Sequence, residues 1–199
     1  LLEHNEKPKS VFQFAKMNNF AEAEFYQFFG NFESIEKQVY QQFLDKTIEL
    51  INKDPNYADY DMKSKMLSFY FTLFELLSAN RSYVLMSLSA HKNQLKNLMQ
   101  FSEMRKGYKD FITEILTDDY RIKNEKVQEL QEKAITEGSW IQLLMTLKFW
   151  MDDSSPNFEK TDIYIEKSVK ATFELMNISP IESLLDFGKF LFKEKIQAK

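Results

Sequence analysis

The stretch FYQFFGNFESI, residues 25–35, decides the fold that this chain of 199 residues is expected to adopt. A helical pattern runs up to Phe29 and is followed by Gly30, the residue type common just beyond a helix C-terminus. Asn31 is then a favourable N-cap for the next helix. The stretch therefore predicts a short helix over 22–29, a tight turn, and a long helix over 32–53.

The segment upstream carries local signals of the same kind. Pro8 ends an expected helix over 1–6, and Ser10 caps a short expected helix over 11–17. Two short helices joined by a few residues and followed by a capped long helix form the helix-turn-helix layout. In such modules the second helix enters the major groove of DNA by its N-terminal end.

The rest of the chain is expected to be helical, because apolar residues recur at three- and four-residue steps and only four Gly and four Pro are present. Gly107 and Gly138 lie inside these patterns and are expected to mark kinks or a break. The expected helices are 59–79, 82–90, 92–116, 124–151, 157–176 and 179–195. We therefore predict an all-α chain, with a three-helix module over 1–53 whose first helix is truncated and a helical bundle over 54–199.

Composition disfavours an enzyme, a metal site and a cofactor. The chain has no Cys, and its two histidines, His4 and His91, show no metal-ligand spacing. No Gly-rich phosphate loop or nucleophile-elbow motif is present. Asp152 and Asp153, beside two serines, are interpreted as a capping segment for the following helix. No apolar run reaches the roughly 20 residues of a membrane span, and no signal peptide is visible, so a cytoplasmic protein is expected. Because the sequence opens with Leu1 inside an expected helix, further residues are expected upstream.

Residues 8–50 resemble the helix-turn-helix of the TetR family of ligand-responsive transcriptional regulators. Tyr26 and Phe29 match the aromatic positions that end the family's recognition helix, Gly30 and Asn31 match its turn, and Ala15 matches the close helix crossing. The resemblance implies a homodimeric repressor that binds a short palindromic operator in double-stranded DNA and is released by a hydrophobic effector. The DNA contacts it implies are Lys9, Ser10, Ala21, Glu22, Glu24, Phe25, Tyr26, Gln27 and Asn31.

The charges of the module depart from the family's pattern. Ala21, Glu22 and Glu24 stand where the family usually carries Ser/Thr, Lys and Thr, and Phe32 replaces a frequent Lys. Residues 1–53 hold six Lys and eight acidic residues, a net charge of −2, and the whole chain carries −4. Carboxylates repel phosphate, although one Glu could accept from cytosine and acids also stabilise a first helical turn. Two alternatives stay open: a TetR-fold protein for an apolar or lipid ligand without a DNA role, and a module whose acidic face binds a basic protein.

The resemblance also places an effector inside the bundle. Pockets for such ligands are mostly apolar and aromatic, and the bundle sequence is rich in both kinds of residue. The residues expected to touch an apolar or lipid-like effector are Phe69, Tyr70, Phe74, Met104, Tyr108, Phe111 and Trp140. The same residues would also suit plain core packing.

The helices expected over 124–151 and 157–176 are joined by a short polar loop, so they should lie antiparallel. Family members dimerise through such a pair around a two-fold axis. The interface residues this implies are Thr161, Ile165, Ser168 and Thr172. The alternative is that the pair packs only within its own subunit.

Overall fold

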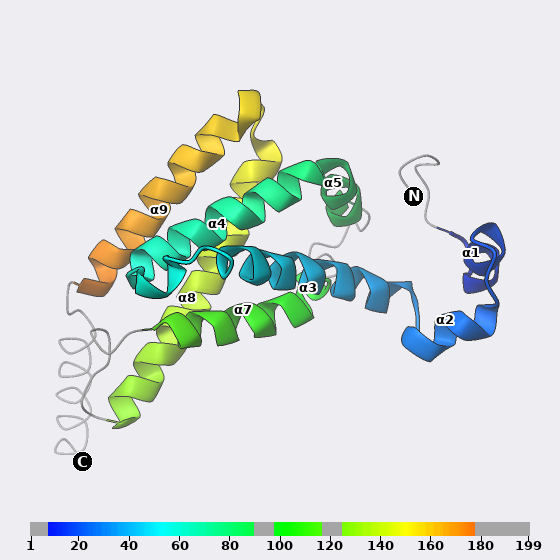
Figure 1. Ribbon diagram of the computed structural model, residues 1–199, viewed down its shortest axis with the longest axis horizontal. Helices are drawn as coiled ribbons and strands as arrows, with labels where there is room; N and C mark the ends of the chain where they lie inside the picture. The colour runs from blue at the N-terminus through cyan, green and yellow to red at the C-terminus, as the bar shows by residue number, and fades with distance from the viewer. Residues whose placement is uncertain (1–7, 90–97, 117–124, 178–199) are drawn as a thin grey trace, which may run out of the picture. The chain divides into compact units, whose positions relative to one another are not determined.

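The computed structural model describes residues 8–89, 98–116 and 125–177. Within these ranges the chain forms eight α-helices and two short 3-10 helices, with no strand (Figure 1). This confirms the all-α class expected from the scarcity of Gly and Pro. Of the helices in the described ranges, none is both long enough and apolar enough to pass through a bilayer.

The helix bounds follow the local sequence signals closely. The α-helices are α1 Val11–Met17, α2 Glu22–Phe28, α3 Phe32–Ile51, α4 Met62–Ala79, α5 Arg81–Ser89, α7 Ser102–Ile115, α8 Glu125–Asp152 and α9 Glu159–Asn177, and the 3-10 helices are η1 Tyr57–Asp59 and η3 Pro156–Phe158. The helix expected from residue 59 starts at Met62, because the 3-10 turn η1 precedes it. The helices expected over 1–6 and 179–195 lie outside the described residues.

The helix expected over 92–116 is observed only in part. Residues 92–97 lie outside the described ranges, residues 100 and 101 form a turn, and α7 then begins at Ser102. The two glycines expected to mark kinks or a break do not end their helices, since Gly107 lies within α7 and Gly138 within α8.

Packing divides the chain into two compact units. The first comprises Leu1–Asp59 and Ser68–Phe111, and the second comprises Tyr60–Leu67 and Ile112–Lys199. The helices α4 and α7 each contribute residues to both units. The sequence predicted a boundary after residue 53 between a helix-turn-helix module and a ligand-binding and dimerisation domain. That boundary separates expected functions and not packing units, and it remains a prediction.

The core of the first unit is built from α3, α4, α5 and α7. Tyr40 and Leu44 of α3 are buried, and the Tyr40 hydroxyl forms a 2.5 Å hydrogen bond with the hydroxyl of Ser87 in α5. The helix α7 approaches α3 closely at Gly107, where an added Cβ would lie 2.7 Å from Leu44 Cδ2. Glycine at this position therefore allows the long helix α3 to pack tightly against α7.

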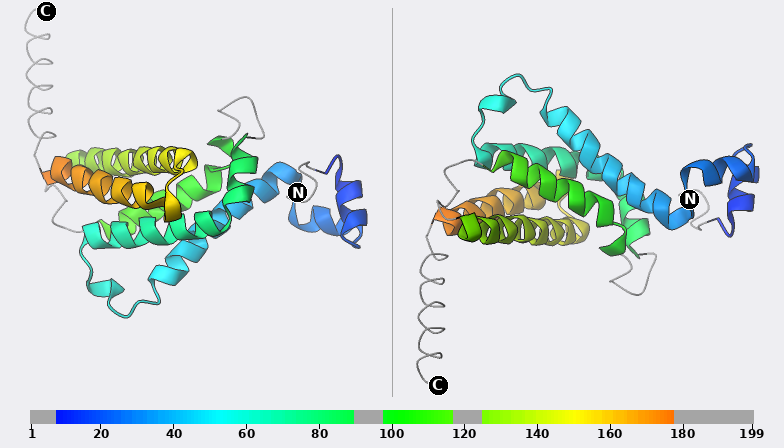
Figure 2. Two further views of the ribbon diagram at one scale, coloured as in Figure 1. Left: turned by 90° about the horizontal axis from the view of Figure 1, so that it is seen from above. Right: turned by 90° about the horizontal axis from the view of Figure 1, so that it is seen from below.

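The core of the second unit is dominated by the antiparallel pair α8 and α9 (Figures 1 and 2). Its buried side chains include Trp140, Leu143, Leu147 and Trp150 of α8 and Ile165, Val169 and Phe173 of α9. The rings of Phe149 and Tyr164 stack across the pair with their centroids 4.5 Å apart. The antiparallel arrangement expected from the short connection is thus confirmed.

The connection between α8 and α9 is organised by Asp153. Its Oδ1 accepts hydrogen bonds from the Ser155 amide and hydroxyl, at 2.8 and 2.7 Å, and its Oδ2 accepts from the Thr161 amide and hydroxyl, at 2.9 and 2.7 Å. Burial by itself raises the pKa of Asp153, but these four donors outweigh it and hold the pKa well below the usual range of a carboxyl group. The interpretation of this segment as a helix cap is confirmed for Asp153.

Candidate functional site

The N-terminal module, residues 8–31 together with the start of α3, is termed the head. Its first helix begins as expected, because the Ser10 hydroxyl accepts a 3.1 Å hydrogen bond from the Gln13 amide. The Gln13 side chain in turn accepts from the Lys9 amide at 3.1 Å. These reciprocal bonds fix the point at which the chain enters α1, and both Lys9 and Ser10 are exposed there.

A tight turn separates α1 from α2. Asn19 has φ 57°, a left-handed conformation that Asn tolerates better than most residues. The amide of Phe20 donates to the carbonyl of Ala15 at 3.1 Å, and Ala15 is buried. Ala15, which the resemblance places at the close crossing of the two helices, is thus buried, and the crossing itself remains a prediction.

Aromatic rings hold the head together. Phe14 of α1 makes edge contacts with Phe20, Phe25 and Phe32, with centroids 5.6, 6.1 and 5.6 Å apart. Phe25 and Phe32 contact each other at 5.6 Å. Each such pair contributes about 0.5–1.5 kcal/mol beyond the burial of its area. Phe25 is only 4% exposed, so it supports α2 from inside the head and does not present its side chain at the surface.

The remaining predicted DNA-contact residues lie at the surface of α2 and at its ends. Ala21 is the N-cap residue and offers no side-chain cap, while Glu22 and Glu24 occupy the first turn. Tyr26 is 55% exposed, and Gln27 is exposed beside it. The N-terminal end of α2 thus carries two carboxylates and no basic side chain.

The junction between α2 and α3 is built as a capping box. The Asn31 side chain accepts a 2.9 Å hydrogen bond from the Ser34 amide, and the Ser34 hydroxyl accepts from the Asn31 amide at 3.4 Å. Gly30 does not adopt a left-handed backbone conformation, since its φ is not positive. A Cβ added to Gly30 would meet no atom within 4 Å. The turn is therefore held by the side chains of Asn31 and Ser34. Neither the backbone conformation nor the space at position 30 requires a glycine there.

Sequence patterns did not reveal how apolar the surface of the head is. Phe12 and Met17 of α1 are 61% and 57% exposed, and Phe28 of α2 is 77% exposed. Amphipathic spacing could not identify them, because α1 and α2 have only seven residues each and do not define a clear face. The head therefore combines exposed aromatic side chains with an acidic N-terminal end of α2.

Six of the seven predicted effector-binding residues are buried in the first unit, and five of them form one aromatic cluster. The ring centroid of Phe69 lies 4.8 Å from that of Phe111 and 5.2 Å from that of Tyr108. The rings of Tyr70 and Phe74 stack with their centroids 6.2 Å apart. Met104 is buried as well. The hydroxyl groups of Tyr70 and Tyr108 lie 3.4 Å apart, and burial raises the pKa of Tyr108 above its usual range although this hydrogen bond partly lowers it. The seventh residue, Trp140, is buried in the second unit.

The predicted dimer residues are buried or half-buried within their own subunit. Thr161 and Ile165 are buried. The Ser168 hydroxyl accepts from Gln142 Nε2 at 3.3 Å, and the Thr172 hydroxyl donates to Gln142 Oε1 at 2.9 Å. The role of these four side chains in a dimer remains a prediction.

A different apolar stripe is exposed on α8. Ala134, Gly138, Ile141 and Met145 lie at steps of three and four residues, and all four are exposed, with Ile141 and Met145 each at 56%. Their spacing places them along one face of the helix. The spacing is visible in the sequence, but the heavily buried residues of α8 follow similar steps, so sequence reasoning could not tell which stripe faces inward.

In the described ranges no group of three or more His, Asp or Glu side chains is placed so that it could hold a metal ion. In a comparison with protein families, residues 65–191, more than half of the chain, match the family described as tetracyclin repressor-like, C-terminal domain. The match begins inside α4 and spans α5, α7, α8 and α9. Comparisons with curated proteins and with solved structures give no significant match.

Proposed function

Because this chain belongs to the TetR family of transcriptional regulators, we propose that it is a dimeric DNA-binding repressor whose operator affinity is lowered by a hydrophobic effector. The observation that supports this most strongly is the head. It consists of two seven-residue helices, a capped turn and the start of the 20-residue helix α3, and it precedes a domain that matches the family. Helices in this layout present the start of the second helix to the major groove.

DNA contacts in this proposal come from exposed groups of the head. Lys9, Ser10 and Lys16 would neutralise or hold phosphates, while Tyr26 and Gln27 lie on the exposed surface of α2. Phosphate neutralisation supplies most of the affinity of DNA-binding proteins and makes it dependent on salt. Glu22 and Glu24 act against it, so binding should be weak and confined to low salt unless one of them accepts from a cytosine.

The test is fluorescence anisotropy with a labelled duplex from the region upstream of the protein's own gene, at several salt concentrations. Binding that weakens as salt rises is the expected result. Glu24→Gln should tighten binding by up to about fivefold, because one exposed charge interaction is worth at most about 1 kcal/mol. The control is Glu75→Gln, which removes an exposed carboxylate from α4. Absence of binding at the lowest salt would contradict the repressor role.

The effector is proposed to occupy the aromatic core of the first unit, among Phe69, Tyr70, Phe74, Met104, Tyr108 and Phe111, with Trp140 as a further candidate. This cluster would favour an apolar molecule with at most a few polar groups, placed near the Tyr70 and Tyr108 hydroxyls. Native mass spectrometry of the purified protein should show retained apolar mass. A Phe69→Ala variant should lose it, and a protein without bound mass would argue against a tightly held lipid.

The dimer is proposed to form through the pair α8 and α9. Thr161, Ile165, Ser168 and Thr172 would then support the pair from within, while the stripe Ala134, Gly138, Ile141 and Met145 would contact the second subunit. Ile141→Glu should shift the protein towards monomer in sedimentation experiments, because it would bury a charge in the contact. Ser102→Glu adds the same charge on the exposed start of α7 and should leave the oligomeric state unchanged.

A second candidate function rests on the acidic and aromatic surface of the head. With Glu22 and Glu24 at the start of α2 and Phe28 largely exposed, the head suits a TetR-fold protein that binds an apolar or lipid ligand without reading DNA. This candidate predicts retained lipid mass together with no duplex binding at any salt concentration. The repressor proposal predicts duplex binding, so the anisotropy experiment separates the two.

A further inference from the structure

An open groove with a volume of about 490 Å³ lies in the first unit, along α3 and beside the C-terminal end of α4. Leu76 of α4 and Asn80, which follows that helix, line the groove, and so does Phe29 at the end of α2. Its volume lies within the range of about 300–1,000 Å³ that is usual for ligand sites. The groove shares no lining residue with the aromatic cluster proposed for the effector, so it is a separate candidate site.

The helix α3 contributes an apolar row and a polar row to the groove. The apolar side chains recur at four-residue steps and are half-buried: Ile35, Val39 and Phe43. The polar side chains recur at the same steps and are exposed: Gln38, Gln42 and Lys46. Residues four apart are neighbours on one helix face, and positions 35 to 46 span about 16 Å at a rise of about 1.5 Å per residue. The groove therefore has an elongated apolar floor with a polar edge beside it.

The charge at one end of this edge comes from a lysine with donors to spare. Lys46 Nζ donates to Glu49 Oε2 at 2.8 Å, and Lys53 Nζ donates to Glu49 Oε1 at 2.6 Å. These two hydrogen bonds, that from Lys46 first, lower the pKa of Glu49 to about 2, so this carboxylate is ionised at neutral pH. Two lysines thus share one carboxylate. An ammonium group carries three donors, so Lys46 can also bond to a ligand.

The sign of the charge in the groove favours an anion. Among the described residues that line it, Lys46 is the only charged one. The neighbouring Asp45 does not line the groove, and its carboxylate accepts from Gln41 Nε2 at 2.8 Å. Gln42 lies one helical turn before Lys46, and its exposed amide can donate to the same anion in exchange for water.

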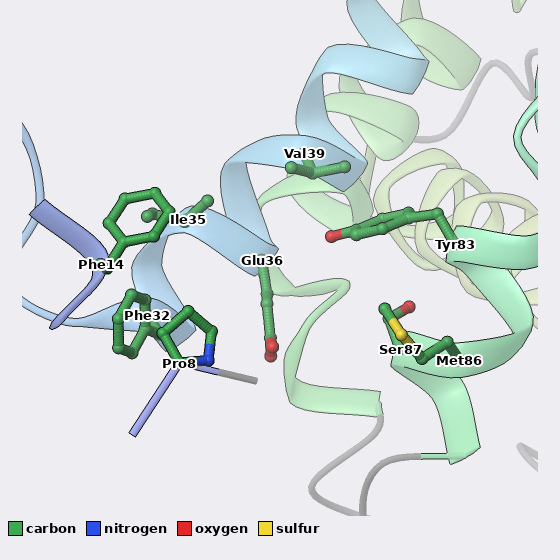
Figure 3. A pocket seen from close by; sticks show the side chains of 9 residues that line it. All are labelled: Pro8, Phe14, Phe32, Ile35, Glu36, Val39, Tyr83, Met86 and Ser87. Carbon is green, nitrogen blue, oxygen red and sulfur yellow. The ribbon is translucent and has the colours of Figure 1, made fainter. Parts of the chain in front are cut away.

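A smaller cavity of about 200 Å³ lies nearby, between the head, α3 and α5 (Figure 3). It shares Ile35 and Val39 with the groove, and its other lining residues, among them Glu36 of α3 and Tyr83 of α5, are different. Lys46 lines the groove and not the smaller cavity. A substitution of Lys46 therefore tests the groove alone.

We propose that this groove binds a monocarboxylate with an unbranched apolar chain. Its carboxylate lies at Lys46 and Gln42, and its chain runs along the apolar row of α3 towards Phe29. Because Phe29 belongs to the head, the ligand contacts the head, α3 and α4 at once. It thus favours the arrangement in which these surfaces lie together. The proposal concerns ligand binding alone and holds whether or not the head reads DNA or the aromatic cluster binds an effector.

The test is isothermal titration calorimetry of the full chain with sodium octanoate, sodium butyrate and 1-octanol. Octanoate should bind at least about tenfold more tightly than butyrate, because it has four more methylene groups and each buried one contributes about fourfold. Lys46→Gln should weaken octanoate binding by about fivefold, through loss of an exposed charge interaction, and leave the affinity for 1-octanol unchanged. The control Lys106→Gln removes an exposed lysine of α7 that does not line the groove, and it should leave all three affinities unchanged.

The comparison of octanoate with butyrate uses the native protein, and equal affinities for the two would overturn the proposal. So would the absence of saturable octanoate binding at millimolar concentration. An unchanged octanoate affinity in Lys46→Gln would also overturn it, because the ligand would then bind elsewhere, as in the aromatic cluster. An equal loss in the Lys46 and Lys106 variants would indicate general attraction to positive charge and would contradict a site at Lys46. Circular dichroism of each variant confirms that the helical fold is retained.

Discussion

Replacing Gly107 by Ala should change the free energy of unfolding in two opposing ways. Alanine stabilises a helix interior by about 1 kcal/mol relative to glycine. The added Cβ, however, would lie 2.7 Å from Leu44 Cδ2 and 3.2 Å from Gln41 Nε2. Leu44 is fully buried, so it cannot move aside without disturbing the packing of α3. Overpacking of this kind costs about 1–3 kcal/mol, and we expect Gly107→Ala to destabilise the protein by about 1 kcal/mol.

The matched control is Gly138→Ala in α8. This glycine is also inside a long helix, but a Cβ added there meets no atom within 4 Å. Within one subunit only the helix propensity remains, so Gly138→Ala should stabilise the folded subunit by about 1 kcal/mol. Urea denaturation followed by far-UV circular dichroism measures both changes, at one protein concentration and with the oligomeric state checked by sedimentation. The two variants should differ in free energy of unfolding by about 2 kcal/mol.

A second background isolates the steric clash. Leu44→Ala removes the atom that the new Cβ would meet, at its own cost of about 2–5 kcal/mol. In that background Gly107→Ala should become stabilising, and the double-mutant cycle should give a coupling energy of about 2 kcal/mol. If Gly107→Ala stabilises the native background as much as Gly138→Ala does, α7 and α3 are not in close contact at Gly107.

Three further variants test the caps and the turn. Asp153→Asn should cost about 1–2 kcal/mol at neutral pH, because one carboxylate oxygen is lost as an acceptor for Ser155 or Thr161. The pKa of Asp153 in the folded state is depressed, so the stability that its carboxylate contributes is complete above the unfolded pKa of about 3.9 and is lost as pH falls below it. Urea melts should therefore show the difference in free energy of unfolding between the native protein and Asp153→Asn shrinking below about pH 4. A difference that stays constant with pH would refute this. Asn31→Ala should lower the free energy of unfolding by about 1 kcal/mol through loss of the cap, and an unchanged value would show that the cap is not needed. Gly30→Ala should be neutral or stabilising by up to about 1 kcal/mol in the same assay, and a loss above 1 kcal/mol would show that the turn does require glycine.

The candidate site was predictable in part. Ser10 and Asn31 marked helix starts because a cap acts over only three residues, and both caps are observed. The resemblance to the TetR family and the aromatic content of the bundle selected Phe69 and Tyr108, which do lie together. The burial of Glu36 was not predictable, because residues far from it along the chain, among them Tyr83 of α5, line the same pocket.

The sequence by itself determined the helical class, most helix boundaries and the layout of the head, because caps, breakers and apolar periodicity act within a few residues of the chain. Only the tertiary structure decided which face of each helix is covered. It buried Thr161, Ile165 and Glu36 within the subunit and left Ile141 and Phe28 exposed. A periodic pattern gives the spacing of a face but not its partner, since the partner is chosen by contacts between residues distant in sequence.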